Sequence, residues 1–164
     1  MKSITARSPH CFSRRYVVKK DDQVIGEYKR RIWNSSLKLR LTDKRQYLLR
    51  KTNWLSSDYE FIRKRDGKQI GTAGKQSMLS STWEIKLFDR VAHLESKGML
   101  NSRFHLVQNQ HKIEEANRRG TCENGWEVQG KDGLQDEFLV FTGLVFQFVL
   151  NRRRAAGASA ASAT

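Results

Sequence analysis

Residues Phe138 to Leu150 read FLVFTGLVFQFVL, thirteen consecutive residues without a charged side chain. Asp136 and Glu137 precede this stretch and an arginine run follows at 152–154, an order of charges that suits the dipole of an α-helix. Apolar side chains would lie on every side of such a helix, so the helix would have to be buried all round. The fold therefore depends on what encloses this segment.

Three environments could bury residues 138–150. A thirteen-residue helix is about 20 Å long, whereas the hydrocarbon core of a bilayer is about 30 Å thick, so we expect no transmembrane span. Two buried strands that turn at Thr142 and Gly143 form the second option, because β-branched and aromatic residues are frequent here. We favour a helix inside the protein and leave the two strands and a membrane anchor as alternatives.

The chain before this segment has the pattern of many short strands. Residues 37–41 alternate strictly, with three leucines on one face and Lys38 and Arg40 on the other. Further strand-like runs lie at 47–51, 82–88, 91–95, 103–108, 112–115 and 126–129. Ten to twelve short strands at close, regular spacing predict a mainly β protein, an antiparallel sandwich or barrel.

Three of the expected hairpins have similar sequences. Residues 16–26 fold back at Asp21-Asp22, and residues 59–71 fold back at Asp66-Gly67, where we expect a tight two-residue turn. Residues 104–114 are a looser third copy, and the three copies begin 43 and 45 residues apart. The chain either repeats one hairpin unit or matches itself by chance.

The composition limits the class of protein. The chain has 164 residues, enough for one domain, and its 31 Lys and Arg against 17 Asp and Glu give a net charge of +14. Residues 1–75 hold 20 of the cations and only 7 of the acids, so an anion-binding surface would belong to this half. Cys11 and Cys122 are too few for a disulfide framework, which favours a reducing, cytoplasmic location.

The termini have no clear pattern of their own. Residues 1–13 are basic and contain Pro9, and we expect a flexible arm there. Residues 14–151 would form the single domain. Residues 152–164 are basic and then rich in Ala and Ser, which is typical of a disordered tail.

Successive short hairpins followed by one apolar segment resemble the tubby C-terminal-like superfamily, in particular its phospholipid-scramblase and LURP-one-related branches. Residues 59–71, with the pattern Tyr-x-Phe…Asp-Gly-Lys-x-Ile-Gly, are similar to the repeated hairpins of these proteins. The resemblance implies a twelve-stranded antiparallel barrel around a central hydrophobic helix at about 134–151. No segment here matches a scramblase calcium site, so scramblase activity is not expected.

Residues that could support catalysis are few and scattered. Gly71 to Ser77 only partly matches a phosphate-binding loop, because Gln69 replaces the first glycine and Gln76 separates Lys75 from the serine. The histidines lack the spacing of a metal site. We therefore expect no enzyme, no metal and no cofactor.

Basic residues on or beside the expected strands are the candidate site. Side chains two residues apart on a strand share a face, so we expect Lys38 with Arg40, and Arg63 with Arg65, to point outward. The predicted anion-binding residues are Lys29, Arg31, Lys38, Arg40, Arg50, Arg63 and Arg65.

This pattern predicts a non-catalytic module that binds anionic phospholipid headgroups and is peripheral to the membrane. Three alternatives remain. The same surface could bind nucleic acid, the protein could be a structural or interaction protein, or the cations could simply keep strand edges soluble.

Overall fold

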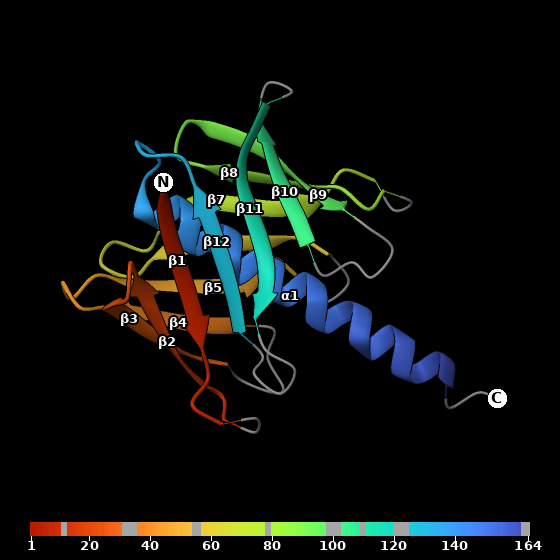
Figure 1. The fold of residues 1–164 in the computed structure, drawn as a ribbon, viewed down its shortest axis with the longest axis horizontal. Helices are drawn as coiled ribbons and strands as arrows, with labels where there is room; N and C mark the ends of the chain where they lie inside the picture. The colour runs from red at the N-terminus through yellow and green to blue at the C-terminus, as the bar shows by residue number, and fades with distance from the viewer. Residues whose placement is uncertain are drawn as a thin grey trace.

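Twelve antiparallel strands form a closed barrel around one long helix in the computed structural model, which describes residues 1–10, 13–30, 36–53, 57–77, 80–97, 103–108, 111–119 and 125–161 (Figure 1). The first six strands are β1 (Lys2–Arg7), β2 (Arg15–Lys20), β3 (Gln23–Arg30), β4 (Ser36–Leu41), β5 (Gln46–Lys51) and β6 (Tyr59–Arg63). The last six are β7 (Lys68–Lys75), β8 (Trp83–Leu87), β9 (Arg90–Lys97), β10 (Arg103–Gln108), β11 (His111–Arg119) and β12 (Gly125–Gly130). The helix is α1 (Asp136–Ala161). This architecture confirms the fold class that the sequence predicts.

Strand β1 closes the barrel, pairing with β2 on one side and with β12 on the other, where Ile4 lies opposite Val128. The prediction of a flexible arm over residues 1–13 is therefore wrong for residues 2–7. Ile4 and Ala6 are fully buried, because alternate residues of this strand point into the barrel. The alternation is short and Ala6 is small, so the sequence signal for β1 is weak.

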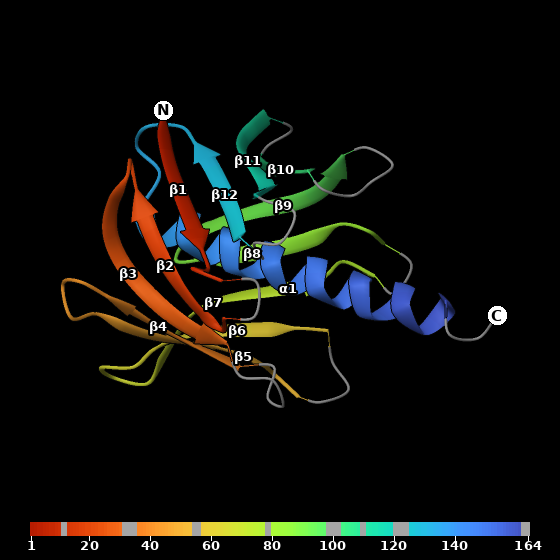
Figure 2. The ribbon, with the colours of Figure 1, turned by 60° about the horizontal axis from the view of Figure 1, so that its bottom comes forward.

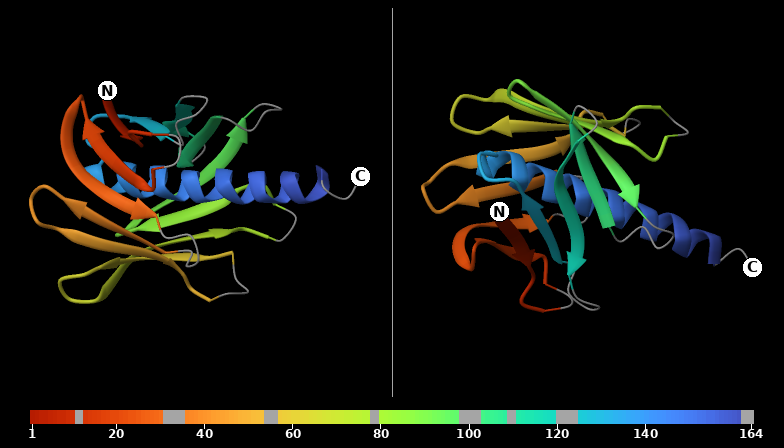
Figure 3. Two further views of the ribbon diagram at one scale, coloured as in Figure 1. Left: turned by 90° about the horizontal axis from the view of Figure 1, so that it is seen from below. Right: turned by 45° about the horizontal axis from the view of Figure 1, so that its top comes forward.

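The loops that connect the strands lie at the two ends of the barrel (Figures 2 and 3). The loops β2–β3, β4–β5, β6–β7 and β8–β9 lie at the end where α1 begins, which we call the helix-entry end. Helix α1 runs through the barrel and continues beyond the opposite, helix-exit end (Figure 3). The helix-entry end therefore combines four tight loops with the first turn of the helix.

The apolar stretch 138–150 lies inside the barrel, as predicted, and is helical, so the two-strand alternative is wrong. Its side chains pack against strand residues. Phe141 stacks on Phe61 with 4.6 Å between ring centroids, and Phe146 meets Phe104 edge to face at 5.2 Å. No helix among the described residues is both long enough and apolar enough to cross a membrane.

Helix α1 begins at Asp136 and continues to Ala161 rather than ending near residue 151. The expected disordered tail is therefore wrong for residues 152–161. Arginine and alanine are strong helix formers, which favours continuation of the helix through this segment. Residues 162–164 lie outside the described ranges.

A short chain of hydrogen bonds connects the helix to the barrel wall. The Tyr28 hydroxyl donates to Gln147 Oε1 at 2.5 Å and accepts from Trp126 Nε1 at 3.0 Å. Gly143 faces the Trp126 ring so closely that a Cβ atom would overlap it. The one glutamine and the one glycine of the apolar stretch are thus both explained by the wall that they face.

The three similar hairpins share a structural detail. The pairs β2–β3, β6–β7 and β10–β11 each contain a register shift, which leaves one extra residue on the second strand. The extra residues are Ile25, Ile70 and Ile113, at matching places in the three sequence copies. This agreement favours a repeated hairpin unit over chance, because bulges are specific local features.

Candidate anion-binding surface

Three predicted residues, Lys29, Lys38 and Arg40, lie together on the outer face of the barrel. Lys38 and Arg40 alternate with buried leucines on β4, as predicted. Lys29 is paired directly with Lys38 across the β3–β4 ladder, and Arg15 is paired with Lys29 on β2. Because neighbouring strands are about 4.8 Å apart, these cations form a compact row.

Arg50 is not free to bind an anion in the same way. It points outward from β5, and its Nε atom donates to Glu60 Oε1 at 2.5 Å on the neighbouring strand. Glu60 is only 14% exposed at its side chain, so it holds the arginine near the barrel wall. Arg31 lies outside the described residues.

The prediction that Arg63 and Arg65 share an outward face is wrong. Tyr59, Phe61 and Arg63 are alternate residues of β6, so Arg63 follows two buried aromatic residues toward the barrel interior. Strand β6 ends at Arg63, where a loop of four residues, 64–67, begins and places Arg65 at the helix-entry end. The expected two-residue turn at Asp66-Gly67 is therefore also wrong.

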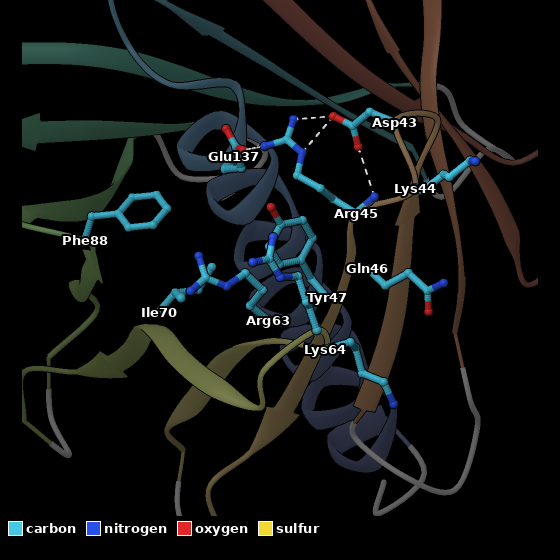
Figure 4. A pocket seen from close by; sticks show the side chains of 11 residues that line it. Asp43, Lys44, Arg45, Gln46, Tyr47, Arg63, Lys64, Ile70, Phe88 and Glu137 are labelled. Carbon is cyan, nitrogen blue, oxygen red and sulfur yellow. Dashed lines mark hydrogen bonds and ion pairs between the residues drawn. The ribbon is translucent and has the colours of Figure 1, made fainter.

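A pocket of about 620 Å³ opens at the helix-entry end beside Arg63 (Figure 4). Its lining residues are Asp43, Lys44, Arg45, Gln46, Tyr47, Arg63, Lys64, Arg65, Ile70, Phe88 and Glu137. Phe88 and Lys44 lie on opposite sides of it in this view. Five cations against two carboxylates in the lining give the entry pocket a net positive charge.

Two arginines of the entry pocket are held by carboxylates. The Arg45 side chain lies between Asp43, to which its Nε donates at 2.7 Å, and Glu137 in the first turn of α1. Arg63 Nη2 donates to Asp66 Oδ2 at 2.6 Å. The side-chain hydrogen bond from Arg63 lowers the pKa of Asp66 to about 2, and that from Arg45 also lowers the pKa of Asp43. Both acids therefore remain charged near neutral pH.

Lys44, Lys64 and Arg65 are exposed at the rim of the entry pocket and form no ion pair within the described part of the chain. Lys64 also lines a second hollow of about 280 Å³. That hollow runs over the outer face and includes Lys29, Lys38 and Arg40, together with Arg15, whose Nε forms an ion pair with Glu27 Oε2 at 3.3 Å. The entry pocket and the outer row thus form one continuous basic surface.

The sequence did not predict a site at Lys44, Arg45, Lys64 or Phe88. These residues lie in loops, where no alternation shows which way a side chain points. The adjacent cations at 44–45 and 63–65 were a usable signal. The first group lies between β4 and β5 and the second where β6 turns into β7, and in an antiparallel barrel these two turns are at the same end.

Among the described residues, no group of three His, Cys, Asp or Glu side chains lies close enough to hold a metal ion. No protein-family model matches the chain, and no curated protein or solved structure does.

Proposed function

We propose that this protein is a non-catalytic module that binds the phosphate-bearing headgroup of an anionic phospholipid in the entry pocket. One observation carries the proposal, namely the three rim cations Lys44, Lys64 and Arg65 beside a concave pocket. The pocket volume lies within the range of about 300 to 1,000 Å³ that small-ligand sites have. Phosphate oxygens are good acceptors for Lys and Arg donors.

The charge pattern favours a local site over a diffuse attraction. A third hollow of about 590 Å³ on the barrel has Asp58 and Glu84 against Lys75, so it lacks the positive excess of the entry pocket. The resemblance of the sequence to the tubby C-terminal-like superfamily supports the same class of ligand by analogy.

The test compares co-sedimentation with neutral phosphatidylcholine vesicles and with vesicles that also contain a phosphoinositide. We expect the triple variant Lys44→Gln, Lys64→Gln, Arg65→Gln to bind the anionic vesicles about 100-fold more weakly, since each cation contributes about 1 kcal/mol near an anionic surface. Its thermal unfolding should hardly change, because exposed charges stabilise folding little.

The matched control removes three exposed cations at the helix-exit end. The variant Arg7→Gln, Lys75→Gln, Arg103→Gln has the same net charge as the rim variant. An equal loss in both variants would mean that only the net charge matters. Tighter binding to an oligonucleotide than to anionic vesicles, in the same salt, would identify nucleic acid as the ligand instead.

A further inference from the structure

Phe88 is an exposed aromatic residue in an unfavourable backbone conformation. It lies in the two-residue turn between β8 and β9, is 48% exposed, and has a φ angle of 53°. Bulky residues rarely adopt a positive φ, and glycine or asparagine would fit this turn at lower cost. Folding alone therefore gives no reason for a phenylalanine here.

The Phe88 backbone is nevertheless well fixed. Its amide nitrogen donates to the carbonyl of Ile70 on β7 at 3.0 Å. Ile70 and Phe88 both line the entry pocket (Figure 4). The aromatic ring is thus held at the margin of the basic pocket by the barrel itself.

Apolar exposure is concentrated at one end of the molecule. Among the described side chains, the exposed large hydrophobic residues all lie at the helix-entry end; they are Met1, Val24, Phe88 and Val91. The rim cations Lys44, Lys64 and Arg65 lie at the same end. Cations beside exposed apolar side chains are what a protein needs to attach to the surface of an anionic bilayer.

We propose that the helix-entry end docks onto an anionic bilayer, with Phe88 and Val91 entering the interfacial layer while the entry pocket holds a headgroup. This inference rests on the proposed function and adds an orientation to it. We assign the contact to the β8–β9 side on the charge of the two turns. Both residues of the turn before Val24 are acids, Asp21 and Asp22, which an anionic surface would repel, whereas the β8–β9 turn has one acid, Asp89, and the cation Arg90 follows it directly. The far end of α1 then points away from the membrane (Figure 3).

The deciding experiment uses the whole chain and two probes. One probe is anionic phosphoinositide vesicles, and the other is the same headgroup as a soluble, chain-free phosphate ester. Phe88→Gly should weaken vesicle binding about tenfold, because an apolar contact is lost. Val91→Ala removes an exposed apolar side chain that does not line the entry pocket, so it should weaken vesicle binding several-fold and leave soluble headgroup binding within about twofold. Glycine suits the positive φ, so Phe88→Gly should be at least as stable as the wild type.

Two further variants serve as controls. Phe88→Trp should bind vesicles about as tightly as the wild-type protein, since tryptophan also favours the interfacial layer. Val24→Ala should have little effect on either probe. A loss of vesicle binding from Val24→Ala as large as that from Phe88→Gly would overturn the assignment to the β8–β9 side.

The remaining outcomes separate this inference from the proposed function. If Phe88→Gly binds vesicles normally while the rim variant does not, the docking orientation is wrong and headgroup binding stands. If Phe88→Gly weakens both probes equally and Val91→Ala weakens neither, Phe88 is a wall of the pocket and not a membrane contact. If the wild-type protein binds neither probe, the proposed function itself fails. Self-association that Phe88→Gly abolishes without any vesicle binding would identify a second copy of the chain as the partner.

Discussion

The Tyr28 hydroxyl is fully enclosed between Gln147 and Trp126. Burial raises the pKa of Tyr28 well above its usual value of 10, although the hydrogen bond from Trp126 opposes this change. The folded protein therefore keeps the phenol proton at a pH where the unfolded chain releases it. Stability from this group is complete below about pH 10 and decreases as the pH rises above that value.

We expect the free energy of unfolding in urea to decrease by up to about 1.4 kcal/mol per pH unit from this group above about pH 10. Tyr28→Phe should cost about 1 to 3 kcal/mol at neutral pH, because Gln147 and Trp126 lose their partner. The variant should also show a shallower alkaline decrease. If the free energy of unfolding of the variant decreases with pH as steeply as that of the wild type, Tyr28 is not the source of the decrease. Burial also raises the pKa of Tyr47, so Tyr47→Phe would be tested next.

Gly143 allows a second test at the residue scale, because helix propensity and packing predict opposite changes in stability for Gly143→Ala. In a helix, alanine is better than glycine by about 1 kcal/mol. Gly143→Ala should nevertheless destabilise the protein by about 1 to 3 kcal/mol in urea, because the added methyl group overlaps the Trp126 ring. Combining it with Trp126→Leu should remove most of this additional cost. Stabilisation by Gly143→Ala alone would show that the helix lies farther from β12.

At the scale of elements, β1 has a larger role than its weak sequence signal indicates. Deletion of residues 1–8 should leave β2 and β12 with unpaired edges and remove the buried residues Ile4 and Ala6. We expect loss of cooperative thermal unfolding, monitored by circular dichroism. Truncation after Arg152 is the control and should shift the unfolding midpoint by only a few degrees, since it leaves the buried helix intact. A cooperative transition in the β1 deletion would show that β1 is dispensable.

The elements that the sequence predicted well are those with long, regular patterns. Residues 37–41 alternate strictly between leucine and a cation, and residues 138–150 have no charged side chain, so one strand face and the enclosed helix could be predicted directly. Strand β1 and the helical extension at 152–161 were missed. Both depend on neighbours: β1 on the need to close the barrel, and the extension on the helix that it continues.

At the scale of the whole molecule, the cations that line the entry pocket and the outer hollow all come from residues 1–75, the half with the charge excess. Lys29, Lys38 and Arg40 were predictable because they lie on regular strands. The entry pocket was not, because it forms where three loops and the first turn of α1 meet. Arg63 shows the difference clearly. Its inward face was available from the alternation with Phe61, although the prediction placed it outward, whereas its position at the pocket could not be predicted.

Barrel closure also affects how the chain is made. A ribosome releases β1 well before β12, although Ser3 Oγ bonds to Glu127 Oε1 across 124 residues of chain. Until residues 138–150 have emerged, inward-facing residues such as Phe61 and Trp83 have no helix to cover them. Contacts this distant in sequence form slowly, and exposed apolar surface in the meantime favours aggregation. The nascent chain is therefore expected to need chaperones that hold its strands apart until translation of the helix is complete.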